Sequence, residues 1–190
     1  MARALHPALS ALLLATALSS CTTNGGNTFL VATKVVFGSG VVDPATGNCT
    51  PPVVFSASTD EALFPTFKAG TEMQLGIVVN SRLSSGTTGA RFQTNDWFAE
   101  RVVVSYEATG SKAVNIPERT LPAQGYVAAA GSGVALGVLI SKDDSVALAA
   151  LSSVRLRVHV IGKLGDGSTA QTSDYEFIAV PGSGGNCIGK

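Results

Sequence analysis

The sequence predicts an all-β fold of antiparallel strands, and three observations support this prediction. Charged residues make up only 14% of the 190 residues, so helix-favouring Glu and Lys are sparse, whereas glycine occurs 21 times. Short runs rich in Val and other β-branched or aromatic residues recur along the chain, and apolar and polar side chains alternate within most of them. No long helical pattern separates these runs, which disfavours a parallel α/β sheet.

Eight segments have the composition of strands. In 71–80 four apolar side chains share one face, and in 154–161 Arg155, Arg157 and His159 form a polar face opposite to Val and Leu. Strands with one polar face are typical of antiparallel sheets that are half exposed to water. The eight segments are 29–37, 53–58, 71–80, 97–107, 113–116, 134–140, 154–161 and 175–180.

Turn signals and at most two short helices connect these segments. Gly165-Asp166-Gly167 predicts the turn before the last strand, and Asp143-Asp144-Ser145 can cap a short helix. A second helical turn is predicted at 59–64, ended by Pro65. The strand spacing is broadly that of an antiparallel β-sandwich, so we expect one immunoglobulin-like sandwich domain of about eight strands over 29–190.

The first 20 residues have the pattern of a signal peptide. Arg3 and the amino terminus are positive, and 8–18 is an uncharged, mostly apolar run that is too short to span a bilayer as a helix. A second uncharged stretch, 120–141, contains a proline and four glycines, so we do not expect it to span a membrane.

Leu18-Ser19-Ser20-Cys21 closes this segment and resembles the lipobox of bacterial lipoproteins. The resemblance implies that diacylglycerol is attached to the Cys21 thiol, that 1–20 is cleaved off, and that the new amino group is acylated, for example with palmitate. Residues 21–28 would then form a lipidated, flexible tether. Ser20 departs from the commoner Gly or Ala. The alternative is an ordinary secretory signal, with Cys21 as a plain thiol.

Thr22, which follows the cysteine, bears on localisation. In lipoproteins of Gram-negative bacteria an Asp at this position retains the protein in the inner membrane. In such a host the resemblance therefore implies a cell-envelope protein of the outer membrane, facing the periplasm or the cell surface. Two or three acyl chains, each contributing about 0.8 kcal/mol per buried CH₂, make a stable membrane anchor.

Cys49 and Cys187 remain after Cys21 is set aside. The signal peptide implies an oxidising compartment, in which two cysteines are expected to form a disulfide bond. A bond between these two would close a long loop and stabilise the fold by about 5 kcal/mol. The alternative is two free thiols.

The sequence contains no recognisable catalytic or metal-binding pattern. There is no G-x-S-x-G and no C-x-x-C, and His159 is the only histidine outside the signal peptide. We therefore expect no catalytic residues, no metal and no cofactor other than the lipid on Cys21. Thirteen basic and thirteen acidic residues balance, so no basic surface is available to attract nucleic acid.

The stretch 91–100 (RFQTNDWFAE) has the strongest recognition potential. It places Phe92, Trp97 and Phe98 among polar residues, as a candidate binding surface; the alternative is that Trp97 fills the core. Our first hypothesis is a lipid-anchored, non-enzymatic envelope protein whose domain is structural or binds another envelope protein. The second is a ligand-binding or glycan-binding module that uses the loop around Trp97, and the third is an enzyme with unrecognised residues.

Overall fold

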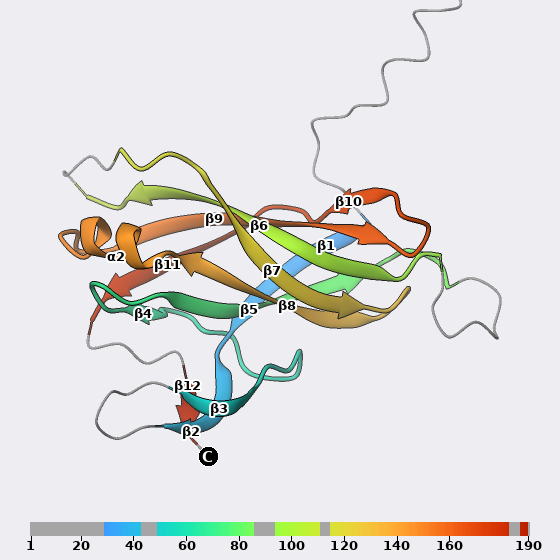
Figure 1. Cartoon of the computed structure of the whole chain (residues 1–190), viewed down its shortest axis with the longest axis horizontal. Coiled ribbons are helices and arrows are strands. Elements are labelled where there is room, and N and C mark those ends of the chain that lie inside the picture. Colours follow the sequence, from blue (N-terminus) through green and yellow to red (C-terminus); the bar gives the residue numbers. More distant parts are fainter. Residues whose placement is uncertain (1–28, 43–48, 86–93, 111–114, 183–186, 190) are drawn as a thin grey trace, which may run out of the picture.

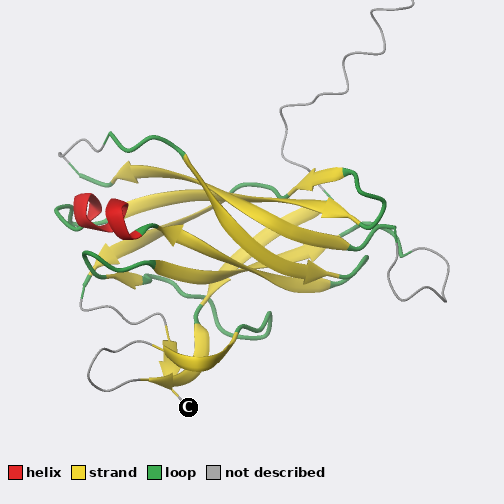
Figure 2. Ribbon diagram, in the orientation of Figure 1, coloured by secondary structure: helices red, strands yellow, loops and turns green. Residues whose placement is uncertain are grey.

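The computed structural model describes residues 29–42, 49–85, 94–110, 115–182 and 187–189, and these form strands almost throughout (Figures 1 and 2). The all-β class predicted from the sequence is confirmed. The strands are β1 (Leu30–Val36), β2 (Gly38–Val42), β3 (Cys49–Val54), β4 (Thr66–Phe67), β5 (Met73–Ser81), β6 (Trp97–Ala108), β7 (Arg119–Val127), β8 (Ser132–Ile140), β9 (Val154–Leu164), β10 (Thr169–Gln171), β11 (Tyr175–Pro181) and β12 (Cys187–Gly189). Among the described residues there is one helix, α2 (Lys142–Leu148), capped by Ser141.

Nine of these strands form one sheet that curls into a half-barrel (Figure 1). Eight follow the order β1-β5-β8-β7-β6-β9-β11-β4, and β10 pairs with β9. The sheet is mixed, because β4 runs parallel to β11. The immunoglobulin-like sandwich is not confirmed. One sheet can replace two because it twists and bends at bulges, such as the one between Ala99 and Arg101 of β6, until its concave face encloses the core.

The core lies on the concave face, where every second side chain of each long strand points inward. The predicted alternation of β9 is confirmed: Val154, Leu156, Val158 and Val160 are fully buried, while the arginines between them face water. Large side chains from other elements complete the core. They include Leu30, Phe67, Met73, Leu75, Ile77, Trp97, Leu139 and Leu148.

The segment from Glu61 to Phe67 lies across the open side of the half-barrel and joins its two edges. The Ala62 N–H donates to the Val35 carbonyl of β1 (2.8 Å), and the Val180 N–H of β11 donates to the Pro65 carbonyl (3.0 Å). The helical turn predicted at 59–64 is therefore wrong. Pro65 forces the residue before it out of the helical region, and pairing with β1 gives Glu61 and Ala62 extended partners.

The remaining strands form a small sheet in the order β12-β2-β3. Its register places Cys187 opposite Gly38 and Cys49 opposite Val42, on the two sides of β2. Strands lie about 4.8 Å apart and residues about 3.3 Å apart along a strand. The Cα–Cα distance between Cys49 and Cys187 in this register is therefore longer than the roughly 7 Å that a disulfide can bridge. The predicted Cys49–Cys187 bond thus stays a prediction that this register does not support. Non-reducing mass spectrometry of the mature protein would distinguish it from two free thiols.

Candidate functional site

Strands β7 and β8 separate partway along their length. Their paired register runs only from Ala123–Tyr126 to Val134–Gly137, although β7 begins at Arg119 and β8 continues to Ile140. Pro122 marks the point of separation on β7, and proline has no N–H to donate to a ladder. Residues 119–122 of β7 therefore pair with β6 alone, and residues 138–140 of β8 pair with β5 alone.

The end of β8 is also irregular on its other side, where it pairs with β5. On β5, Met73 pairs with Ile140 and Gln74 pairs with Val138, so Leu139 has no opposite residue. The Leu139 carbonyl instead accepts a hydrogen bond from the Tyr106 hydroxyl of β6, at 3.0 Å. Burial raises the pKa of Tyr106, and the nearby Asp144 carboxylate raises it further, which keeps this hydroxyl protonated as a donor.

An ion pair bridges the far end of the separation. Arg119, at the start of β7, makes two bonds to Asp144 of α2: Nε to Oδ2 at 3.0 Å and Nη2 to Oδ1 at 2.7 Å. The Asp144 side chain is only 6% exposed and also accepts from the Ser141 hydroxyl. Hydrogen bonds from Arg119, and then from Ser141, hold the pKa of Asp144 below its ordinary value. The helix is thereby tied across the gap between the two strands.

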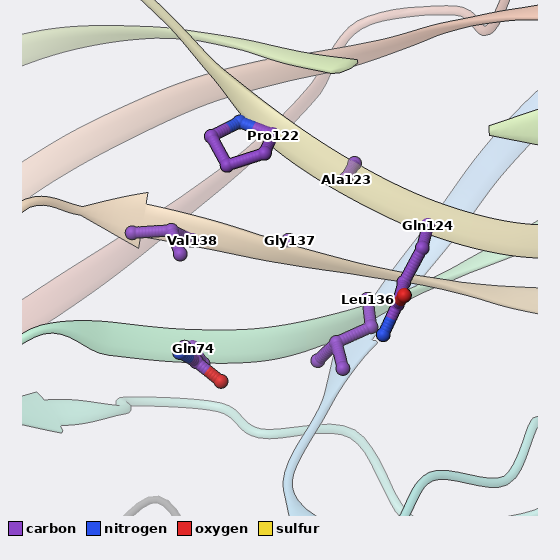
Figure 3. A pocket seen from close by; sticks show the side chains of 7 residues that line it. All are labelled: Gln74, Pro122, Ala123, Gln124, Leu136, Gly137 and Val138. Atoms are coloured by element: carbon purple, nitrogen blue, oxygen red, sulfur yellow. The ribbon is translucent and has the colours of Figure 1, made fainter. Parts of the chain in front are cut away.

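A groove of about 200 Å³ lies on the outer face of the sheet where the strands part (Figure 3). Its lining is neutral and mostly apolar. The lining residues are Gln74, Pro122, Ala123, Gln124, Leu136, Gly137 and Val138. Figure 3 shows Gln124 reaching from β7 toward Leu136 of β8, whereas Gln74 on β5 lies nearer to Val138. This lining offers apolar contact and amide hydrogen bonds, but it contains no acid, base or nucleophile.

Gly137 lines the groove with its backbone, and a side chain at this position would point to the core side of the sheet. A Cβ atom built at Gly137 would lie 3.1 Å from Cγ1 of the buried Val102, which is closer than ordinary contact. A side chain at position 137 would therefore require the core side chain of Val102 to shift slightly.

An aromatic pair extends the apolar surface beside the groove. Phe98 and Tyr126 lie with ring centroids 5.3 Å apart, and Tyr126 is 44% exposed. The Tyr126 hydroxyl donates to Asp96, at 3.0 Å, and the other oxygen of this buried carboxylate accepts from the Ala129 N–H. The hydrogen bond to Asp96 raises the pKa of Tyr126. The ring is thus held in a fixed orientation next to Gln124.

The residues predicted from 91–100 separate into different environments. Trp97 is fully buried, and its Nε1–H donates to the Ala170 carbonyl at 3.3 Å, so it belongs to the core and not to a surface. Phe98 is partly exposed on the outer face, beside the groove. Phe92 and the lipidation site Cys21 lie outside the described residues. His159 faces Asp174, with Nδ1 3.3 Å from Oδ1.

None of the groove residues was predicted from the sequence. No protein-family model matches the chain, and no curated protein matches it. Within the described ranges, no three His, Cys, Asp or Glu side chains gather where they could hold a metal ion. The one helix of these ranges is too short to cross a membrane.

Proposed function

We propose that the protein is a lipid-anchored, non-enzymatic component of the cell envelope whose β domain binds a partner protein. The observation that carries this proposal is the neutral, apolar groove between β7 and β8 with the Phe98–Tyr126 pair beside it. When a partner removes apolar surface of a folded domain from water, the free energy falls and the complex is stabilised. Its lining suits binding rather than chemistry, since it contains only amide and apolar side chains.

The membrane anchor in this proposal is Cys21. Its support is the resemblance of Leu18-Ser19-Ser20-Cys21 to a lipobox and the small, polar segment that separates Cys21 from β1. Labelling cells with a palmitate analogue tests it. The wild-type chain should incorporate the label and Cys21→Ala should not. Equal labelling of both chains, or of neither, would refute the anchor.

Position-specific photo-crosslinking in living cells tests the binding function. A photoreactive amino acid at position 124 or 74 lies at the groove, whereas position 171, an exposed glutamine on β10, is a matched control. The groove positions should each give the same discrete crosslinked protein, and position 171 should not. If the groove positions crosslink no more than the control, the groove is not the binding surface.

The second candidate is a glycan ligand. The partly exposed ring of Tyr126, held beside the amide of Gln124, has the combination of stacking face and hydrogen-bonding groups that suits a sugar. This relocates the glycan hypothesis from the loop around Trp97 to the outer face. The crosslinking experiment separates the two, because glycosidase digestion removes the added mass of a glycan adduct and leaves the added mass of a protein adduct in place.

A further inference from the structure

We infer, on the basis of the protein-binding function proposed above, that the occupant of the groove is an extended, uncharged peptide segment. This segment would pair its backbone with the strand edge that is left open where β7 and β8 separate. Apolar side chains at alternate positions would lie on Pro122, Leu136 and Val138.

The backbone provides the first reason. Beyond Ala123 and Gly137 the two strands no longer pair with each other, although both remain strands. Backbone N–H and C=O groups of a sheet need hydrogen-bond partners. At this edge the Leu139 carbonyl, which has no partner strand, accepts a hydrogen bond from the Tyr106 hydroxyl. A short open edge inside a sheet is a place where an added peptide strand gains main-chain hydrogen bonds.

The chemistry of the lining provides the second reason. A charged peptide would lose its hydration over Pro122, Leu136 and Val138 without meeting an opposite charge. The amides of Gln74 and Gln124, in contrast, can both donate and accept, which matches peptide N–H and C=O groups. In a strand, alternate side chains point to the same face, so an apolar residue at every second position fits this lining.

A side chain from outside the large sheet already packs on this same face. Phe55, directly after β3, packs over Gly76 of β5: a Cβ atom at Gly76 would lie 3.0 Å from its Cδ1. Gly76 pairs with Leu136, which lines the groove. The surface that accepts an aromatic side chain from the small sheet therefore continues into the groove. Helix α2, tied by Arg119 and Asp144, bounds the other end.

Peptide display on the full-length protein in detergent tests the inference. A library of random linear peptides of about six residues, the usual strand length, should yield uncharged sequences with alternating apolar residues. Gln124→Glu adds a charge without changing size, and should weaken the best peptide at least about tenfold. Gln171→Glu makes the same change on β10, away from the groove, and should leave its affinity unchanged.

Methylation of the peptide backbone separates strand pairing from side-chain docking. Methylating the nitrogens of every second residue should abolish binding for at least one of the two alternate sets, because those N–H groups pair with the sheet. Binding that survives methylation of either set would overturn the inference, as would peptides that bind Gln124→Glu as well as wild type. If crosslinking captures a protein at position 124 but no peptide depends on the groove, the proposed function stands and this inference fails. If neither occurs, both fail.

Discussion

The outer face of the half-barrel has two halves that differ in charge. Over β6, β9 and the start of β11 many outward side chains are charged or ionisable, and they lie in four pairs. These pairs are Glu107–Arg155 at 3.4 Å, Arg157–Glu176 at 2.6 Å, His159–Asp174 at 3.3 Å and Glu100–Lys163 at 3.8 Å. Over β5, β8 and β7 the groove is lined by glutamine and apolar side chains, and Phe98 and Tyr126 lie at its side.

The difference shows where binding free energy is available. On the charged half most of these side chains are exposed to water and already paired, so covering the pairs would cost desolvation with little new attraction. On the neutral half the strands part and leave an apolar groove in contact with water. A partner that fills it gains from apolar burial without stripping water from ions. The two halves share one core, so this contrast belongs to the outer face alone.

The largest expected effect is on stability, and it tests whether the outer face is energetically separate from the core. Trp97→Ala should lower the free energy of unfolding by about 3–5 kcal/mol, because it removes a fully buried aromatic side chain. Phe98→Ala, one residue along and partly exposed, should cost less, about 1–2 kcal/mol, from its contact with Tyr126 and the smaller apolar area that it buries. Denaturant unfolding measures both. Equal losses would mean that the neutral half of the outer face is part of the core.

A smaller effect concerns the tie across the separation. Asp144→Asn should lower the free energy of unfolding by about 1.5–3 kcal/mol at pH 7, since it removes charged hydrogen bonds to Arg119. The pKa of Asp144 is lowered in the folded protein, so its stabilisation is complete above the ordinary pKa of 3.8 and is lost as pH falls through the folded value.

Denaturant unfolding at a series of pH values measures this loss. The difference between wild type and Asp144→Asn should shrink below about pH 4, as the wild-type carboxylate becomes protonated. Asp143→Asn, at the adjacent residue of α2, is a control that leaves the Arg119 bonds in place. A difference that stays constant down to acid pH would show that the ionised pair does not hold the helix.

Much of the fold could be predicted from alternation. Segments 71–80, 134–140, 154–161 and 175–180 correspond closely to β5, β8, β9 and β11. Strand β7 was not predicted, because Pro122, Gln124 and Gly125 are poor strand formers, and pairing with β6 and β8 holds them extended. The curling of the sheet into a half-barrel also could not be predicted from any short stretch of sequence. It depends on bulges and on the segment that follows Glu61.

The candidate site was harder to predict, and β6 shows why. Counting by two from the inward Val102 places Phe98 inside and Trp97 outside. The extra residue at Glu100 in the bulge reverses this order, so Trp97 enters the core and Phe98 faces out. The groove is lined by Pro122 and Gly137, which disfavour strands by themselves. The site forms where the backbone pairing between β7 and β8 ends. The residues at such a point are those that sequence patterns interpret as strand breaks.

The smallest expected effect concerns the charged half. Exchanging the pair, with Glu107→Arg and Arg155→Glu together, should leave the unfolding midpoint unchanged, because both side chains are exposed and the attraction is kept. Arg155→Glu alone places two carboxylates opposite each other and should lower the midpoint slightly, by less than Asp144→Asn does, and more at low salt than at high salt. Neither change should alter crosslinking from position 124. If the exchange of this distant pair abolished that crosslink, the partner would be held by the charged half as well, and the division of the outer face into a binding half and a hydrated half would be wrong.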